Sequence, residues 1–413
     1  MPKNNLIAGL DIGTTKVCAI IGQATDSGEI EIVGVGIQKS TGVRKGVIVD
    51  IDATTKAIEL AMGSAMQQAN CDIEQVYVGV TGEHILSVNS SARVAISHVD
   101  RLIHSSDVER VKEASCVIVL PPDRQIVHAL TRGFSVDGQA NIQNPAGMHA
   151  SRLEVDTHIV HGSTPFLQNV DRCVTSAGLA VAAHVLEPIA TASAVLLPAE
   201  KQLGVCIVDI GGGTSDIAVY RDGCIYFSSV LPIGGTHVTN DLAYGLAVEP
   251  EEAERLKTES GSALECLVPE QEVVQVAQLG RDDSRGLRRR ALAHIIEPRM
   301  LELFELVQQE LEAAECTGII PAGVVISGGG SLLSGCLEAA TQVLGVPVRR
   351  GVPIGIASLP ETLQSPCYAT AIGLVQFGVN EQKAFPGLHN SGTGWLAALK
   401  EWLHKLLAPF TQN

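Results

Sequence analysis

Residues 10–22 of the chain read "LDIGTTKVCAIIG", and residues 208–220, "VDIGGGTSDIAVY", repeat the same order of residue types. In both stretches an apolar run meets an Asp, a turn of Gly and Thr follows, and a second apolar run begins. Each run is short and rich in β-branched residues, which is typical of strands joined by a hairpin and too short for helices. The repetition in the two halves of the chain predicts a duplicated fold.

A third glycine-rich signal occupies residues 323–345, "GVVISGGGSLLSGCLEAATQVLG", and predicts a strand, a glycine turn and a helical run. Glycine at a strand end lets the backbone approach an anion closely, because no Cβ intervenes. The N–H groups of such turns can donate to phosphate oxygens. The chain has no GxxxxGK[ST] P-loop, and no GxGxxG opens a helix after its first strand. The three stretches together indicate a different kind of phosphate-binding cleft.

Asp11 and Asp209 end the strands that lead into the first two turns. A carboxylate there would repel phosphate unless a divalent cation lay between them, so this pattern favours a nucleotide bound with Mg²⁺. The same two carboxylates are the candidate catalytic residues, as a base or as groups near the metal.

The composition narrows the class of protein. A chain of 413 residues with 46% hydrophobic residues predicts two to four folded domains, and a net charge of −16 argues against nucleic acid as a partner. The ten cysteines form no CxxC pair, which indicates small buried residues in a reducing compartment. We see no signal segment and no run of the ~20 apolar residues that a membrane span requires. These features favour a cytosolic protein unless the C-terminal segment changes the interpretation.

Taken in order, the motifs resemble the actin-like ATPase superfamily and, within it, the FtsA family of bacterial cell-division proteins. Further stretches that carry the resemblance are "NPAGMHASRLEVDTHIV" (144–160), "LPIGGTHVTNDLA" (231–243) and "IIEPRMLEL" (295–303). The resemblance implies an α/β fold with duplicated actin-like, ribonuclease H-like lobes around a nucleotide cleft. It also implies small inserted domains and a C-terminal amphipathic helix. Two helices of small residues, 187–196 and 369–378, would connect the lobes and cross closely.

The resemblance also implies a division into domains. The expected parts are a first lobe (1–84, 164–198 and 369–380), an inserted small domain (85–163), a second lobe (199–248 and 317–368), a small helical domain (249–316), a linker (381–394) and a membrane-targeting helix (395–410). The inserted domain would serve self-association and contacts with later division proteins. Within it, Ser106 and Glu109 have the spacing of a capping box for a helix.

By the same likeness, the nucleotide would contact both hairpin turns, a turn of the second lobe and an adenosine turn. The residues so implied are Gly13, Thr14, Thr15, Lys16, Gly211, Gly212, Gly213, Thr214, Gly234, Gly235, Glu254, Lys257, Gly328, Gly329 and Gly330. Asp11 and Asp209 would hold Mg²⁺ through water. Glu254 and Lys257 lie three apart on an expected helix, so an ordinary surface ion pair is the alternative for them. On a helix expected at 297–315, Arg299 and Glu302 resemble the surface that the family offers to the division ring.

The C-terminal segment "WLAALKEWLHKLLAPF" (395–410) follows a stretch rich in Gly, Asn, Ser and Pro that is typical of a linker. On a helix, its large apolar residues fall on one face: Trp395, Leu396, Leu399, Trp402, Leu403, Leu406, Leu407 and Phe410. Both tryptophans of the chain lie here, with lysines at the polar edge, which favours a helix lying in an anionic membrane interface without spanning it. A terminal helix docked on a domain of the protein is the alternative.

Together with these features, the resemblance to the FtsA family implies an adaptor that binds ATP and Mg²⁺ and tethers the FtsZ-type tubulin-like ring to the inner face of the cytoplasmic membrane at the septum. Self-association, recruitment of later divisome membrane proteins and at most weak ATP turnover would accompany this role. The alternatives are another actin-fold ATP binder, such as a MreB-like filament protein, a pilus-assembly protein, or a sugar or acetate kinase.

Overall fold

Two five-stranded sheets with the same strand order form the centre of the protein. The computed structural model describes residues 6–25, 29–277, 279–280, 283–357 and 359–384. The first sheet has the order β11-β6-β1-β2-β3, with β1 Leu6–Ile12, β2 Lys16–Ala24, β3 Ile30–Lys39, β6 Gln75–Val80 and β11 Ala180–Leu186. The second has the order β14-β13-β12-β17-β18, with β12 Val205–Ile210, β13 Ser215–Arg221, β14 Cys224–Leu231, β17 Val324–Ser327 and β18 Val348–Arg350.

In both sheets the first three strands run antiparallel and the remaining two join parallel. The two stretches that repeat in the sequence are the β1–β2 and β12–β13 hairpins, so the predicted duplication is confirmed. Each hairpin turn follows an Asp near the end of its first strand.

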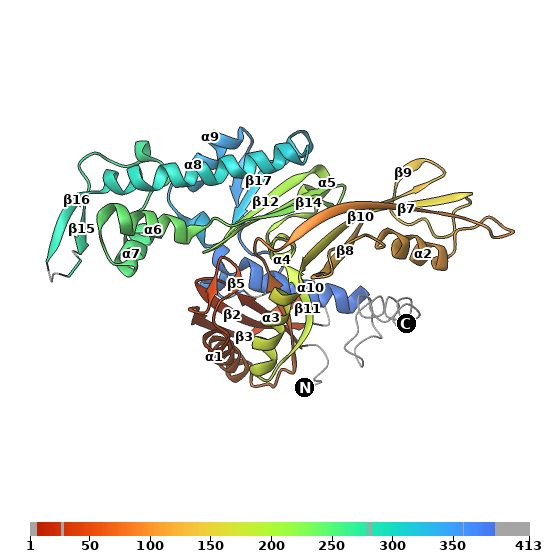
Figure 1. The fold of residues 1–413 in the computed structure, drawn as a ribbon, viewed down its shortest axis with the longest axis horizontal. Coiled ribbons are helices and arrows are strands. Elements are labelled where there is room, and N and C mark those ends of the chain that lie inside the picture. The colour runs from red at the N-terminus through yellow and green to blue at the C-terminus, as the bar shows by residue number, and fades with distance from the viewer. Residues whose placement is uncertain (1–5, 26–28, 278, 281–282, 358, 385–413) are drawn as a thin grey trace.

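Helices α4 Glu187–Val195 and α10 Ala369–Ala384 lie between the two sheets and pack on each other (Figure 1). A Cβ added at Gly373 would lie 1.8 Å from the carbonyl oxygen of Ala190, so the two backbones touch. The expected close crossing of two small-residue helices is therefore confirmed. Helices α1 Ile51–Ala69 and α3 Thr164–Ser176 cover the first sheet, near the short strands β4 Val43–Arg44 and β5 Val47–Ile48.

A separate antiparallel sheet, β7-β10-β8-β9, forms the insert in the first half of the chain. Its strands are β7 Leu86–Ala95, β8 Arg124–Val136, β9 Gln139–Ile142 and β10 Arg152–Ser163, and helix α2 Ser105–Ser115 packs on β7 and β10. The predicted cap at Ser106 is wrong: the cap is His104, two residues earlier, and the Asp107 carboxylate accepts the N–H of His104 at 2.9 Å.

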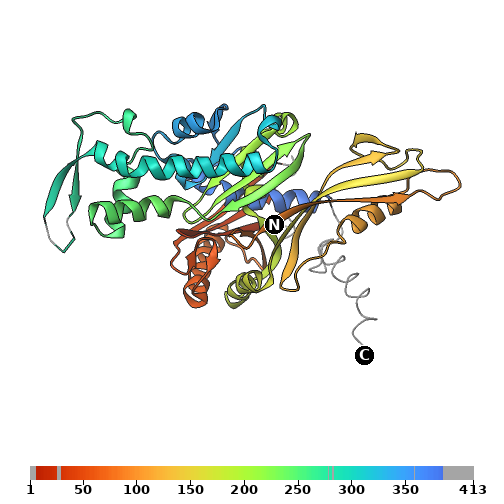
Figure 2. The same ribbon diagram turned by 45° about the horizontal axis from the view of Figure 1, so that its top comes forward.

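A third group of elements extends from the second sheet. Its members are α6 Gly235–Leu246, α7 Pro250–Ser260, β15 Val273–Ala277, β16 Ser284–Arg288 and α8 Arg289–Ala313. The β15–β16 hairpin and the insert lie at opposite ends of the molecule in both orientations (Figure 1 and Figure 2). Helices α5 Pro198–Leu203 and α9 Cys336–Leu344 complete the second lobe.

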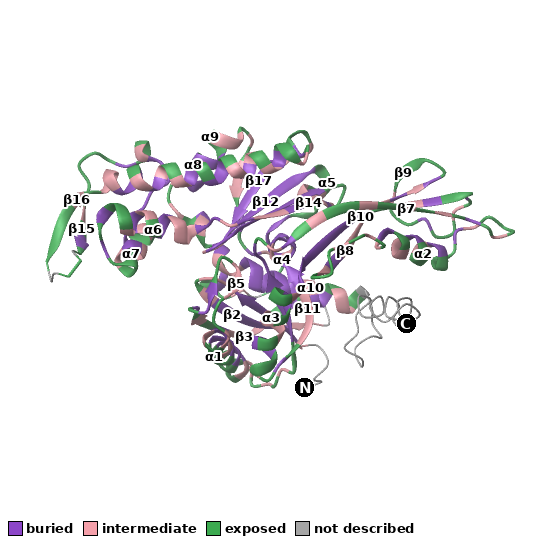
Figure 3. Cartoon of the chain, viewed as in Figure 1, coloured by how far each residue is buried: buried purple, intermediate pink, exposed green. Residues whose placement is uncertain are grey.

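Helix α8 begins at Arg289, eight residues before the start expected at residue 297. Pro298 removes one backbone donor from the helix, but it does not end it. Buried Leu292, Ile296 and Met300 continue one apolar stripe through the proline, so burial of this stripe outweighs the missing hydrogen bond. The buried residues follow the central strands and the inner face of this helix (Figure 3).

The end of helix α10 also differs from the sequence expectation. The helix continues to Ala384, so the linker expected from residue 381 begins at least four residues later. The rest of that linker and the expected membrane helix at 395–410 lie outside the described residues. Within the described ranges, no helix combines the length and the apolar character that crossing a membrane requires.

Candidate functional site

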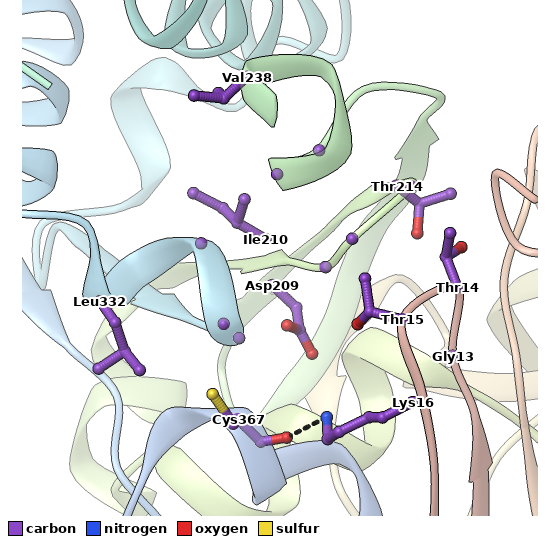
Figure 4. Close-up of a pocket in the computed structure, with 18 of the residues that line it drawn as sticks. Gly13, Thr14, Thr15, Lys16, Asp209, Ile210, Thr214, Val238, Leu332 and Cys367 are labelled. Carbon is purple, nitrogen blue, oxygen red and sulfur yellow. Dashed lines mark hydrogen bonds between the residues drawn. The ribbon is translucent and has the colours of Figure 1, made fainter. Parts of the chain in front are cut away.

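A cavity of about 350 Å³ lies between the lobes, where the β1–β2 and β12–β13 turns meet (Figure 4). The structure places every residue that the sequence assigned to the nucleotide or to the metal in its lining. They come from the first hairpin (Asp11, Gly13, Thr14, Thr15, Lys16), the second hairpin (Asp209, Gly211, Gly212, Gly213, Thr214), the start of α6 (Gly234, Gly235), α7 (Glu254, Lys257) and the turn after β17 (Gly328, Gly329, Gly330).

The two turns approach each other closely because the second consists of glycine. A Cβ added at Gly212 would lie 2.6 Å from Cγ2 of Thr15, and one at Gly213 would lie 2.6 Å from Oγ1 of Thr14. A side chain at either position would push the turns apart. Thr14 and Thr15 accordingly lie opposite Thr214 in Figure 4.

Backbone donors gather at this meeting point. The N–H groups of Thr14, Thr15, Gly212 and Gly213 make no hydrogen bond to any part of the chain that the structure describes. The N-terminus of α6 reaches the same cavity at Gly235. Free amides beside a helix N-terminus suit an anion, above all a phosphate.

The base of the cavity is acidic. Asp11, Asp209 and Glu187, which begins α4, line it, and the buried Asp216 pairs with Asp209 across the strands of the second hairpin. Nζ of Lys16 lies 3.9 Å from Oδ2 of Asp11 and donates a hydrogen bond to the carbonyl oxygen of Cys367 at 2.6 Å. Carboxylates therefore outnumber the cation beside them. Their oxygen donors fit a hard divalent cation such as Mg²⁺.

Burial raises the pKa of each of these acids. For Asp11, burial is the main cause of the raised pKa, while Lys16 lowers the pKa and Asp209 raises it further. For Asp209, burial outweighs the hydrogen bonds that lower the pKa. Burial raises the pKa of Asp216 to about 8, and that of Glu187 well above its usual range, where repulsion from Asp216 adds to the effect. A cation or a network of donors is needed to keep such a group ionised at neutral pH.

Hydroxyl groups hold two of the acids. Thr191 on α4 and Thr370 on α10 both donate to Oδ2 of Asp209, the second at 3.0 Å. Thr81, which follows β6 in the first lobe, donates to Oδ1 of Asp216 in the second lobe at 2.5 Å. The connecting helices and a direct contact between the lobes thus position the carboxylates.

The opposite end of the cavity is apolar, with walls from Val238, Met300, Leu303, Leu332 and Leu333. Gly328 has φ +77°, and a Cβ there would lie 2.3 Å from Oδ1 of Asp209, so this position in the turn after β17 tolerates only glycine. An apolar slot beside glycine amides has the character of a small-molecule binding pocket.

Glu254 and Lys257 border this slot and also pair with each other, with 2.6 Å between Oε2 and Nζ. Thr239 donates to Glu254 at 2.5 Å, and Lys257 donates to the carbonyl oxygen of Gly235 at 3.1 Å. Both sequence interpretations of the pair therefore describe part of its geometry: it is an ion pair, and it lines the cavity.

Arg299 and Glu302 do not line the cavity. Arg299 forms a two-pronged pair with Asp241 of α6, at 2.6 Å from Nε and 3.1 Å from Nη2, and also donates to Glu302 at 2.5 Å. The pair thus ties α8 to α6 on the outside of the second lobe.

The sequence analysis missed Thr81, Glu187 and Asp216 as members of the site. Asp216 lies within the quoted repeat, but only its burial beside Asp209 distinguishes it from a surface residue of a strand end. Glu187 begins a helix that we interpreted as a connection alone. Thr81 carries no sequence signal, because its partner lies 135 positions away.

Comparison with known proteins identifies the family. The chain matches the family model "Cell division protein FtsA" over residues 206–373 and the model "SHS2 domain inserted in FTSA" over residues 82–161. The cell division protein FtsA of Pseudomonas aeruginosa is 40% identical over 407 residues, which are 96% of this chain and 97% of that protein. The chain belongs to the FtsA family.

Other FtsA proteins give the same result. The FtsA of Neisseria meningitidis is 37% identical over 96% of this chain and 97% of its own length, and that of Escherichia coli strain K12 is 34% identical over 97% and 98%. The resemblance predicted from the sequence is confirmed, and the protein is a cell-division protein of the FtsA type.

Solved structures show the fold. A chain of a PilM–PilN type IV pilus biogenesis complex superposes with a TM-score of 0.66 at 17% identity, over 90% of this chain and 98% of its own. MreB 5 of Spiroplasma citri bound to AMPPNP superposes with a TM-score of 0.56 at 16% identity, over 93% and 99%. The expected actin-like α/β fold of this FtsA-family chain is therefore confirmed.

Proposed function

We propose that this protein binds ATP with Mg²⁺ and links the FtsZ-type, tubulin-like division ring to the inner face of the cytoplasmic membrane at the septum. The observation that carries the nucleotide part is the meeting of two glycine turns, with free amides, above a base of buried carboxylates. Membership of the FtsA family supports the role in division over a sugar kinase or a MreB-like filament protein of the same fold.

In this proposal the phosphates lie between the turns at Thr14, Thr15, Gly212 and Gly213, and the purine lies in the apolar slot. Mg²⁺, held by Asp11 and Asp209 through water, neutralises phosphate charge when it is bound. Lys16 offsets part of the remaining negative charge. The residues of this chain orient the nucleotide and close the two lobes on it.

ATP would then serve as an assembly signal, with weak turnover. Thr81 and Asp216 join the lobes beside the phosphate turns, so a ligand there can change how the lobes sit together. Self-association would bring many membrane anchors onto one polymer, and weak anchors combine by avidity. Asp11 and Asp209 remain the candidate catalytic carboxylates.

The proposed partner surfaces lie elsewhere. Arg299 and Glu302 on α8 face the division ring, the insert serves self-association and later divisome membrane proteins, and residues 395–410 bind anionic lipid.

The proposal is tested by sedimentation of the purified chain with anionic liposomes and the purified ring protein, with and without Mg–ATP. The full chain should carry the ring protein into the liposome pellet, and a chain truncated after Gly394 should leave it in the supernatant. Equal pelleting by both chains, or failure of the full chain to bind Mg–ATP, would overturn the proposal.

A further inference from the structure

A cluster of histidine and aspartate side chains lies in the insert, outside the nucleotide cavity. His98 lies in the loop after β7, His104 directly precedes α2, and Asp107 lies in the first turn of that helix. One ligand atom from each of the three lies within 4.8 Å of the others. A fourth donor, Oδ2 of Asp100, lies 3.6 Å from Nε2 of His104.

The spacing of these atoms is close to that of a metal site. Nε2 of His98 lies 3.0 Å from Oδ2 of Asp107, and the rings of His98 and His104 have centroids 4.2 Å apart. Ligand atoms that surround a tetrahedral zinc ion at ~2.0–2.2 Å lie about 3.3–3.6 Å from one another. Small rotations of the side chains would therefore bring them into coordination.

The surrounding contacts orient the carboxylate toward the histidines. Asp107 is buried, and its Oδ1 accepts a hydrogen bond from Arg110 at 2.8 Å. Its Oδ2 faces His98 and also accepts the N–H of His104 at 2.9 Å. Such outer contacts fix metal-binding carboxylates in place, although the charge of Arg110 also weakens the attraction for a cation.

The site is open to solvent. The side chains of His98 and His104 are 35% and 47% exposed, so an ion can reach them without a change in the fold. Two imidazoles with carboxylates are the donor set of zinc, whereas Mg²⁺ prefers oxygen ligands alone.

We propose that His98, His104 and Asp107, with Asp100 as a fourth donor, bind one Zn²⁺ ion. The ion joins the loop after β7 to the start of α2 and stiffens the outer end of the insert. Val99, fully exposed on this loop, is held at a defined place as a result. Without the ion, the same contacts form a hydrogen-bonded cap for α2.

The test is calorimetric titration of Zn²⁺ into the zinc-free full chain in excess Mg²⁺ and without nucleotide, because ATP itself binds Zn²⁺ and the carboxylates of the cavity would otherwise bind it too. The background carries Cys266→Ser, because Cys266 is an exposed thiol. One Zn²⁺ should bind per chain, and His104→Gln and Asp107→Asn should each weaken binding by roughly tenfold or more, since even loss of an outer contact has that effect. His294→Gln is the matched control, since His294 pairs with Glu265 at 3.1 Å in the other lobe.

Binding that is unchanged in His104→Gln, or absent from the parent chain, would overturn the proposal. Circular dichroism confirms that the variants fold, which the exposure of His104 favours. In a second measurement, Co²⁺ should give d–d absorption without a thiolate charge-transfer band. A thiolate band would assign the ion to cysteines and would also overturn the proposal. Nucleotide binding does not enter either result, so the function proposed above is tested separately.

Discussion

At the scale of single residues, the cavity depends on positions where no other side chain fits or where a charge is buried. Gly213 lies against the backbone of Lys45, and Asp216 lies buried beside Asp209. The sequence identified the glycine, because a glycine turn after a strand has a recognisable pattern. It did not identify the buried acid as part of the site, because burial is a property of the assembled lobes.

Replacement of Gly213 by Ala should weaken nucleotide binding about tenfold or more, or ~1.4 kcal/mol. The added Cβ would lie 2.6 Å from Oγ1 of Thr14 in the first hairpin turn and would separate the two turns. Binding of a fluorescent ATP analogue in the presence of Mg²⁺ measures the effect. Gly133→Ala is the control, because a Cβ there meets nothing within 4 Å. Equal affinities of the two variants would contradict the proposed contact between turns and phosphate.

Replacement of Asp216 by Asn should stabilise the ligand-free protein increasingly as the pH rises from 6 to 8. The folded pKa of about 8 lies above the value of 3.8 for an unburied Asp. The folded state therefore holds a proton that the unfolded state has lost, and folding becomes less favourable as the pH rises between these values. The amide of Asn cannot ionise, so the variant does not lose this stability as the pH rises.

The measurement is the difference in melting temperature between the Asn variant and the wild type across that pH range, without nucleotide or Mg²⁺. Asp72→Asn, on an exposed residue, serves as the control. A difference independent of pH would show that Asp216 does not titrate as expected.

At the scale of elements, local signals located the strands and helices better than their ends. Helix α8 continues back through Pro298 to Arg289, and α10 continues to Ala384. In the first case an apolar stripe buried by the second lobe outweighs a residue that normally interrupts helices. Such packing comes from residues far away in the chain, so a local pattern cannot include it.

Replacement of Gly373 by Ala should lower the free energy of unfolding by about 1–3 kcal/mol, as overpacking does in cores. The new methyl group would lie 1.8 Å from the carbonyl oxygen of Ala190, where α10 crosses α4. Urea denaturation of the ligand-free chain measures this free energy of unfolding. Gly63→Ala in α1, where a Cβ meets nothing within 4 Å, should instead raise stability by up to ~1 kcal/mol. Stability of both variants at or above the wild-type value would exclude the close crossing.

Replacement of Arg299 by Ala should reduce co-sedimentation with the ring protein about fivefold or more, the effect of losing an interface residue worth ~1 kcal/mol. Nucleotide affinity should stay the same, because Arg299 lies outside the cavity. Arg255→Ala on α7 is the control, since Arg255 likewise forms surface ion pairs, with Glu252 and Glu259. An unchanged pellet would remove α8 from the proposed partner surface.

At the scale of the whole molecule, the cavity proposed to bind nucleotide belongs to neither lobe alone. Its turns come from β1–β2 and β12–β13, and α4 and α10 set the distance between the two sheets. The insert packs against β14 of the second lobe through β7 and β8. A change in the angle between the lobes would therefore reach the insert, as the proposed link between nucleotide and assembly requires.

Replacement of Trp402 by Glu in the C-terminal segment should lower liposome binding roughly tenfold or more. A large apolar side chain in the interface contributes about 1.5–3 kcal/mol, and a charge there reverses this contribution. Glu401→Ala, on the opposite face of the expected helix, should bind at least as well as the wild type. Liposome co-sedimentation of the full chain gives the comparison. Equal binding of the Trp402→Glu variant and the wild type would favour the alternative, a helix docked on the protein.

The sequence by itself determined the two hairpins, the glycine turns and the small-residue helices, because turn chemistry, strand length and residue size are local properties. From them followed the duplicated fold and the hairpin residues of the cavity, and the resemblance to the FtsA family added Gly234, Gly235, Glu254 and Lys257, which line it as well. Tertiary structure alone decided that Thr81 meets Asp216, that Glu187 joins the acidic base, and that the histidines and aspartates of the insert converge. Each of these depends on contacts between different elements, and burial then changes what the side chain can do. The sequence shows that a residue has a carboxylate, but the pKa of that carboxylate is raised only when the fold removes water from it.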